Sequence, residues 1–365
     1  PYAYGLETVA SSSLVASNAA NTMRITNAAN TNATGYMVGW DSLEDARFLT
    51  ELLKQNIKVR FTEKAMSSSG ENFAPGSLII VRGDNHTHNN LDQILVDTAN
   101  KYNRKLQSIA SGYSTSGPDV GSPDIKLVNK QKVAMLSGDN TSSLSYGALW
   151  HFFEQQLHYP VTSINTEHLS RVDLYKYNVL IMPSGNYRSL LNEDGMKKLT
   201  SWVRAGGKVI AIDRALSAFA GKEGFSLKYN EGDKNEGNDL IPYADRQREF
   251  AKNLITGAIF KTQVDNTHPM AFGYDKIYFS LKLGSTSYSL LNGGFNVAHI
   301  GAQPTKVSGF AGSEAIKKLP NSLVFGEERK GRGSFIYLVD NVMFRSFWEN
   351  GKLFLVNAIF FVNNN

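Results

Sequence analysis

The stretch GGKVIAIDRALS (residues 206–217) predicts the end of one helix, a tight turn, a buried strand and the start of a second helix. Glycine commonly ends a helix, and the apolar run KVIAID has the length of a buried strand. In several enzyme families such a strand-to-helix corner carries the nucleophile. Here the corner offers Asp213 and Arg214, and the chain contains no cysteine. The stretch therefore predicts the shape of a reactive corner without a thiol.

Strand and helix patterns also alternate in the first third of the chain. In DSLEDARFLTELLKQN (41–56) the apolar residues recur at the spacing of one helical face. Strand-like runs surround it at YMVGW (36–40), IKVRF (57–61) and SLIIV (77–81), and a second helix is expected from about 91 to 102. This β-α-β-β-α-β order favours an α/β layer structure.

Residues 112–124 are dense in Gly, Ser, Pro and Asp, which is typical of a linker. A second alternation follows at the spacing of parallel βαβ units. Its elements are expected at KVAMLSG (132–138), SYGALWHFFEQQLH (145–158), YPVTSIN (159–165), NVLIMPSG (178–185) and EDGMKKLTSWVRAGG (193–207). The polar, glycine-rich residues 221–243 are expected to form a mobile insertion near the strand ends. A helix is expected next at RQREFAKNLI (246–255), and after it the composition shifts toward strand patterns.

These patterns predict an α/β fold of two parallel-sheet units. The first unit is expected at 1–128 with an irregular arm, and the second at 129–365 with a β-rich C-terminal part. The length of 365 residues agrees with two domains. Hydrophobic residues make up 42% and charged residues 19% of the chain, which is typical of a globular protein and excludes a disordered one.

Charge and residue usage exclude several function classes. The net charge is +5, but the Lys and Arg residues are dispersed, so no nucleic-acid partner is expected. The apolar runs are shorter than the roughly 18 residues of a membrane span. The absence of cysteine excludes disulfides, thiolate metal sites and cysteine catalysis. Because the chain starts at Pro1 without a leader pattern, we expect it to be part of a longer protein.

Two histidine patterns suggest metal sites. His151 and Glu154, with His268 as a distant third ligand, have the spacing of a zinc site. However, an amphipathic helix flanked by aromatic residues favours a structural role for Glu154. His86 and His88 lie two residues apart and could face one ion, although an exposed loop explains them better. We expect no metal ligand in either place.

A candidate ligand crevice lies where the predicted parallel strands end. Ligands bind to open parallel sheets in the crevice outside the carboxyl ends of the strands. The residues expected there are Ser184, Gly185, Asn186, Asp213 and Arg214. Two interpretations of Asp213 and Arg214 remain open: a polar clamp for a ligand, or a helix N-cap followed by a charge that faces solvent.

The segments YNVLIMPSGNYRSLL and AGGKVIAID resemble the class I glutamine amidotransferase-like fold, a flavodoxin-like sandwich. The resemblance implies that MPSG supplies the oxyanion strand and that the later corner supplies a Cys nucleophile. Aligned in this way, Asp213 or Arg214 stands where the Cys belongs. Neither side chain can act as a thiolate, so we expect no amidotransferase chemistry and no catalytic residue.

A second resemblance covers nearly the whole chain. Its segments are YMVGWDSLEDARFLTELLKQNIKVRF, FAPGSLIIVRGDN, LWHFFEQQLHYPV, THPMAFGY and GRGSFIYLVDNVMFRSFWENGKLFLVNAIFF. They look like the region C-terminal to the catalytic domain in large bacterial zinc carboxypeptidase-like proteins of the carboxypeptidase A type. The resemblance implies a secreted or periplasmic metallopeptidase, a hydrolase whose zinc is held by an N-terminal domain that is absent from this sequence. No cofactor is then expected here.

The leading hypothesis is a non-catalytic accessory region that stabilises the parent peptidase or positions its substrate. Its expected partner is its own N-terminal peptidase domain. The alternative is a ligand-binding module that takes a peptide, sugar or cell-wall fragment into the strand-end crevice. A third hypothesis, a metal-dependent hydrolase, would rest on His86, His88 or His151.

Overall fold

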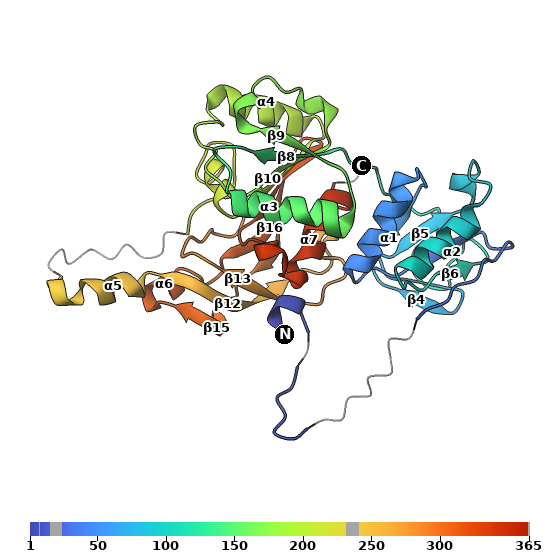
Figure 1. Cartoon of the computed structure of the whole chain (residues 1–365), viewed down its shortest axis with the longest axis horizontal. Coiled ribbons are helices and arrows are strands. Elements are labelled where there is room, and N and C mark those ends of the chain that lie inside the picture. Colours follow the sequence, from blue (N-terminus) through green and yellow to red (C-terminus); the bar gives the residue numbers. More distant parts are fainter. Residues whose placement is uncertain (7, 15–23, 231–240, 364–365) are drawn as a thin grey trace.

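The structure is a computed structural model that describes residues 1–6, 8–14, 24–230 and 241–363 (Figure 1). It contains one five-stranded sheet, one ten-stranded sheet and a small hairpin, with helices packed against the two larger sheets. Part of the insertion expected at 221–243, namely residues 231–240, lies outside the described residues. Within the described ranges no helix is long and apolar enough to cross a membrane.

The five-stranded sheet is built by the first third of the chain. Its strands are β1 (Gly35–Val38), β2 (Arg60–Thr62), β5 (Leu78–Val81), β6 (Gln107–Ile109) and β7 (Ile125–Leu127), in the order β6-β1-β5-β2-β7. Helices α1 (Leu43–Lys54) and α2 (Leu91–Lys101) follow β1 and β5. A hairpin of β3 (Met66–Ser68) and β4 (Glu71–Phe73) adds Met66 and Phe73 to a small core on Met37 and Ile79.

The expectation of a parallel sheet in this first unit is wrong, because all neighbouring strands pair antiparallel. Helix α1 does connect two parallel strands, β1 and β2, but β5 lies between them. In the same way, α2 connects β5 and β6 across β1. This split βαβ arrangement keeps the two crossovers that the sequence order predicts. The order along the chain does not reveal which strand is inserted between the crossover partners.

The ten-stranded sheet has a parallel half. Its strands β8 (Val133–Ser137), β9 (Val161–Asn165), β10 (Val179–Met182), β11 (Lys208–Ile212) and β17 (Gly333–Leu338) lie in the order β9-β8-β10-β11-β17. Numbered along the chain, this order is 2-1-3-4-5, the flavodoxin-like arrangement. The predicted α/β class and the flavodoxin-like parallel sheet of the second unit are therefore confirmed.

An antiparallel half extends the sheet beyond β17. It consists of β16 (Leu323–Lys330), β14 (Phe295–His299), β12 (Ile255–Val264) and β13 (Ile277–Lys282), while β15 (Thr305–Ala311) pairs with β12. Strands β12 and β15 project from the body together with α5 (Arg246–Lys252) and α6 (Ser313–Ile316), at the left of Figure 1. The shift toward strand patterns that is expected after the helix at 246–255 corresponds to this half.

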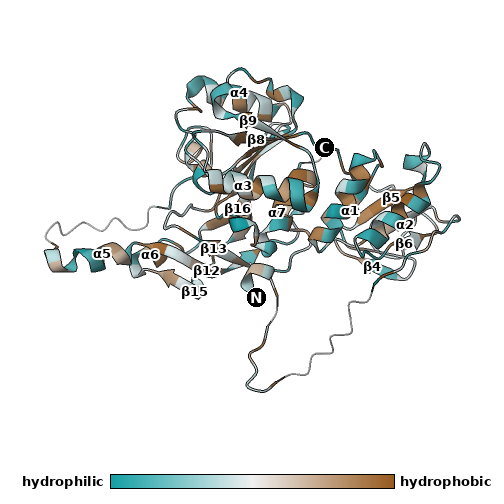
Figure 2. Ribbon diagram, viewed as in Figure 1, coloured by the Kyte–Doolittle hydropathy of each residue, from teal (hydrophilic) through white to brown (hydrophobic). Residues whose placement is uncertain are grey.

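Helices cover both faces of the parallel strands. Helices α3 (Ser143–His151) and α7 (Glu349–Phe360) pack on the face that carries Met135, whereas α4 (Glu193–Arg204) packs on the face that carries Ala134. Successive residues of a strand point to opposite faces, so strands covered on both sides are apolar at every position. Figure 2 shows this continuous hydrophobic colour along β8.

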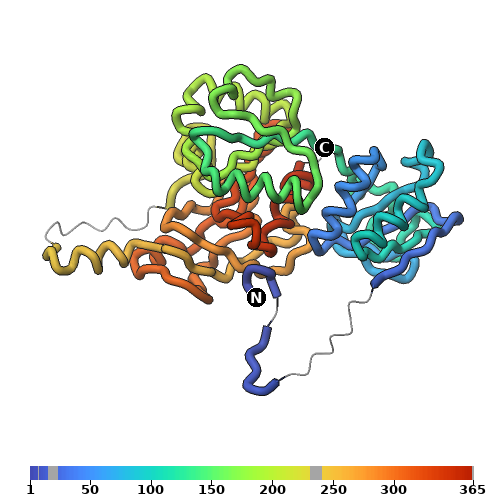
Figure 3. The backbone as a smooth tube through the Cα atoms, viewed as in Figure 1, coloured from blue at the N-terminus to red at the C-terminus, as the bar shows by residue number. Residues whose placement is uncertain are grey.

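The two units share one continuous hydrophobic core. The ring of Phe361, just after α7, stacks on Phe61 at 4.4 Å between centroids and lies 4.6 Å from Trp40. The Trp40 indole Nε1 donates to Asn357 Oδ1 at 2.9 Å. Figure 3 shows the two parts of the chain in contrasting colours, blue for the first unit and red for α7. One hydrophobic cluster therefore spans the expected boundary near residue 128, although each sheet also has a smaller cluster of its own.

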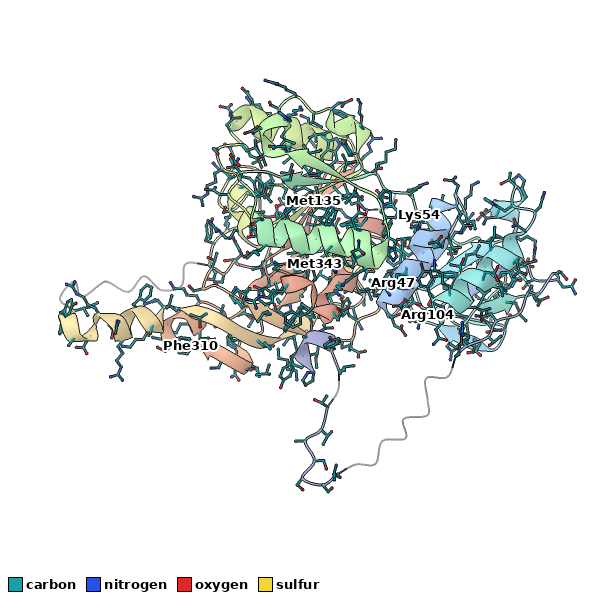
Figure 4. All side chains as sticks on the ribbon, in the orientation of Figure 1. Arg47, Lys54, Arg104, Met135, Phe310 and Met343 are labelled. Atoms are coloured by element: carbon teal, nitrogen blue, oxygen red, sulfur yellow. The ribbon has the colours of Figure 1, made fainter. Side chains whose placement is uncertain are left out.

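A π-helical turn (Phe152–Leu157) continues α3 and faces the first unit. A π-turn departs from the regular hydrogen-bond ladder and so redirects carbonyl groups. Arg47 Nε of α1 donates to Gln156 O at 2.6 Å, and Thr50 Oγ1 donates to Leu157 O at 3.0 Å. Figure 4 shows Arg47 at the boundary between the two units. The redirected carbonyls thus become hydrogen-bond acceptors for the neighbouring unit.

A buried lysine ties β11 to the last helix. Lys208, the first residue of β11, is 2% exposed. Its Nζ donates to the carbonyl oxygens of Ala358, Ile359 and Val362 at the C-terminal end of α7. Carbonyl groups at a helix C-terminus lack partners within the helix, and a cationic donor there is favourable. The start of the central strand is therefore fixed to the end of the chain's last helix.

Candidate ligand-binding site at the strand ends

A pocket of about 470 Å³ lies at the carboxyl ends of β11 and β17. Four of the five residues expected in the crevice line it, namely Gly185, Asn186, Asp213 and Arg214. Ser184, the fifth, is buried behind them and hydrogen-bonded to Asp213. The loop after β10 and the turn after β11 bring these residues together, as the rule for open parallel sheets predicts.

Asp213 occupies the corner between β11 and the 3-10 helix Asp213–Ala218 with a φ of 53°. This left-handed conformation is strained for most side chains, and Asp is one of the few residues that adopt it readily. The carboxylate does not cap the helix. Instead, Ser184 Oγ donates to Asp213 Oδ2 at 2.7 Å. The N-cap interpretation of Asp213 therefore does not hold, and the residue lines the pocket; a role as a clamp for a ligand stays a prediction.

The loop 184–186 is held by α3 and by the segment that precedes it. Ser184 N donates to Ser145 Oγ at 3.0 Å, and Asn186 N donates to Asn140 O at 2.9 Å. A Cβ on Gly185 would lie 2.3 Å from Asn140 O, so this close approach requires glycine. Because the amides of Ser184 and Asn186 are already bonded, they do not offer the free N–H pair of an oxyanion hole.

Asp340 adds a second carboxylate to the pocket. It lies two residues after β17, whereas Asp213 follows β11 directly. Its Oδ2 accepts a hydrogen bond from Ser280 Oγ, and Lys282 Nζ lies 3.7 Å from its Oδ1. Burial raises the pKa of Asp340 above its ordinary value; Lys282 and Ser280 oppose this shift, and Asp213 adds to it. Sequence reasoning missed Asp340, although FIYLVD repeats the pattern of KVIAID, an apolar strand that ends in Asp.

Two tyrosines form an aromatic wall of the pocket. The rings of Tyr229 and Tyr288 stack with centroids 5.2 Å apart. Arg188 holds the wall, since its guanidinium donates to Tyr229 Oη at 3.0 Å and to Ser217 O at 3.3 Å. Burial is the main cause that raises the pKa of Tyr288. These residues come from loops far apart in the sequence, and no local pattern points to them.

The pocket combines charges of both signs. Arg188, Arg214 and Lys282 contribute cations, and Asp213 and Asp340 contribute carboxylates. Arg214 is exposed and makes no ion pair with any residue that the structure describes. No histidine is found among the described residues that line the pocket, and the Ser184 hydroxyl is buried behind Asp213. This arrangement can bind a small polar molecule.

The histidine patterns do not converge on one place. His268 is buried, and its Nε2 lies 2.9 Å from Glu327 Oε2, whereas His151 and Glu154 are exposed. His86 Nδ1 lies 3.1 Å from a backbone carbonyl. Across the described residues, no group of three or more His, Asp or Glu side chains is placed to hold a metal ion. His268 therefore serves a buried polar network instead of completing a site with His151 and Glu154.

No protein-family profile and no curated protein matches the chain. Similar solved structures include a ThuA-like protein from Bacteroides uniformis, with 14% identity, a TM-score of 0.37, and coverage of 62% of this chain and 89% of that one. A glutamine amidotransferase from Thermotoga maritima has 9% identity, a TM-score of 0.34 and coverage of 58% and 76%. A GMP synthase component from Thermoplasma acidophilum has 9% identity, a TM-score of 0.38 and coverage of 63% and 96%. The structural neighbours thus include ThuA-like and glutamine amidotransferase-like folds, and the resemblance to zinc carboxypeptidase-like proteins stays a prediction.

Proposed function

We propose that the chain is a non-catalytic accessory region of a secreted or periplasmic zinc carboxypeptidase-like protein. In this proposal it positions substrate by binding a peptide or saccharide fragment in the strand-end pocket. The lineage rests on the sequence resemblance alone. In that lineage the zinc and the proteolysis belong to the N-terminal peptidase domain, which is also the proposed partner of this region.

One observation supports a binding role most directly. Asp213 stands at a left-handed corner, where its carboxylate bonds to Ser184 beside the exposed guanidinium of Arg214. In several enzyme families such a strand-to-helix corner carries the nucleophile. Here it carries the Asp213 carboxylate, which accepts a hydrogen bond from the Ser184 hydroxyl. Charged groups held in place around a pocket of about 470 Å³ suit recognition of a polar ligand.

Binding in the pocket should be visible as thermal stabilisation. We expect the matching peptide or saccharide of a broad panel to raise Tm by about 2–5 °C at saturating concentration, because a ligand that binds only the folded state stabilises it. Arg214→Ala removes a pocket charge, so the shift should disappear in this variant. Arg171→Ala is the matched control, since Arg171 is exposed and lies outside the pocket lining. A panel without any shift counts against the binding role.

Removing the charge of Asp213 should weaken ligand binding while leaving the stability of the fold nearly unchanged. Asn also tolerates the left-handed conformation and keeps an acceptor for Ser184, so Asp213→Asn should change the free energy of unfolding by less than about 1 kcal/mol. We expect the same variant to lose most of the ligand-induced shift. Equilibrium denaturation and the thermal-shift assay measure the two effects. Peptide hydrolysis by the isolated chain that is abolished in Asp213→Ala would overturn the non-catalytic assignment.

A further inference from the structure

Two neighbouring hollows beside the strand-end pocket form a positively charged groove, and Arg188 lines both the pocket and the first hollow. One, of about 580 Å³, lies between α4 and the loop 222–225, and the other, of about 350 Å³, lies between that loop and the loop 289–293. Both are lined by Gly224, Phe225 and Lys330, so they are continuous. We call the two hollows together the basic groove.

Positive charge predominates in the basic groove. Seven Lys and Arg side chains but only three Glu side chains line it, a net charge of +4 compared with +5 for the whole chain. Arg204, Lys222 and Lys228 are exposed and form no ion pair within the described part of the chain. By contrast, Lys330 pairs with Glu328 at 2.9 Å. Unpaired cations in a concave surface raise the local concentration of anions.

An aromatic ring lies in the middle of the groove. Phe225 is half-buried and packs edge-on against Phe335 with centroids 5.0 Å apart. Lys330 Nζ lies 5.8 Å from the centre of the Phe225 ring. Phe335 thus holds the Phe225 ring in place, and the ring adds an apolar surface to a groove that is otherwise lined by Lys, Arg and polar side chains. Hydroxyl and amide side chains also line the groove, and they include Asn192, Ser201 and Ser289.

We infer that the basic groove binds an acidic oligosaccharide. The C–H face of a sugar ring can pack on Phe225, its carboxylate or sulfate groups can pair with Arg204, Lys222 and Lys228, and its hydroxyls meet the polar side chains. A peptide strand would find no free sheet edge here, because β16 is paired on both sides. Single-stranded nucleic acid needs successive aromatic platforms, and one ring supplies a single platform.

Calorimetric titration of the full chain with short oligogalacturonates tests this inference. We expect binding that weakens severalfold between about 50 and 300 mM NaCl, because screening reduces exposed charge pairing. Neutral dextran oligosaccharides should not bind. The double variant Lys222→Glu/Lys228→Glu should bind at least roughly tenfold more weakly, since both substitutions reverse an exposed charge of the groove.

Lys306→Glu is the matched control, because Lys306 is exposed on β15 and lies outside the groove. It should bind within about twofold of the unchanged chain. Equal affinity of the double variant, or no binding by the unchanged chain, overturns the inference. Tighter binding of polyglutamate or single-stranded DNA overturns the saccharide assignment. Lys222 and Lys228 line the groove and not the strand-end pocket, so the result for this double variant can be told apart from the pocket experiments.

Discussion

Phe361→Ala is expected to lower the free energy of unfolding by about 3–5 kcal/mol, the usual cost of removing a phenyl ring from a packed core. The ring is 2% exposed and lies against Phe61 and Trp40 of the first unit and Phe272 of the second. No nearby side chain can fill the space without leaving its own contacts. Both units should therefore lose stability together.

Urea denaturation followed by circular dichroism and tryptophan fluorescence measures this effect. Phe310→Ala is the matched control, because Phe310 is 48% exposed near the end of β15. We expect the control to change the free energy by no more than about 0.5 kcal/mol. If Phe361→Ala left one unit fully stable while the other unfolded early, the two sheets would not share a cooperative core.

Glu327→Ala is expected to cost about 3–5 kcal/mol as well, because it breaks a buried network and leaves polar partners unpaired. Glu327 is fully buried on β16. Its carboxylate accepts hydrogen bonds from His268 Nε2 at 2.9 Å and Ser334 Oγ at 2.5 Å, and Arg329 Nε lies 3.3 Å away. The Met270 amide donates to His268 Nδ1, which places the ring proton on Nε2, facing the carboxylate.

The same residue predicts a dependence on pH. Burial raises the pKa of Glu327, but the hydrogen bonds from His268 and Ser334, together with the electrostatic effect of His268 and Arg329, lower it, so the pKa lies below its ordinary value of 4.5. The unfolded chain therefore takes up this proton first as the pH falls. The stabilisation by Glu327 is complete above about pH 4.5 and is lost as the pH drops through the lower pKa of the folded state.

Denaturation curves between about pH 3 and pH 7 test this prediction. The unchanged chain should lose more stability on the acid side than Glu327→Ala, because the variant has no carboxylate to protonate at this position. Glu167→Ala is the control, since Glu167 is exposed. If the curves of the unchanged chain and Glu327→Ala ran parallel across this range, the carboxylate would not contribute in its charged form.

The parallel sheet could be predicted from the sequence because local signals define it. Apolar runs such as KVIAID, separated by amphipathic helices, require strands that are covered on both faces. The rule that ligands bind at the carboxyl ends of strands then predicted the region of Asn186 and Asp213. Asp340 could have been found by the same rule, because it lies just beyond the end of β17, the neighbour of β11. The first sheet is antiparallel because β5 lies between β1 and β2, and β1 lies between β5 and β6. No local feature of the sequence indicates this strand order.

Long-range partners account for the features that sequence reasoning missed. His268 and Glu327 are 59 residues apart, and nothing near either residue indicates that they meet. Phe61 and Phe361 each have the pattern of an ordinary core residue of their own unit. Their stacking depends on how the two sheets pack. The Tyr229 and Tyr288 wall likewise depends on two loops that only the folded chain brings together.

Lys208 and Asp213 stand at opposite ends of one short, stiff strand. β11 spans five residues, roughly 16 Å, with the anchor of α7 at its start and the pocket carboxylate just after its end. Trimming the chain before Ala358 would take away all three acceptors of the lysine and release an unpartnered amine inside the protein. A truncation remote from the crevice would thus remove the anchor at the opposite end of the strand that precedes Asp213.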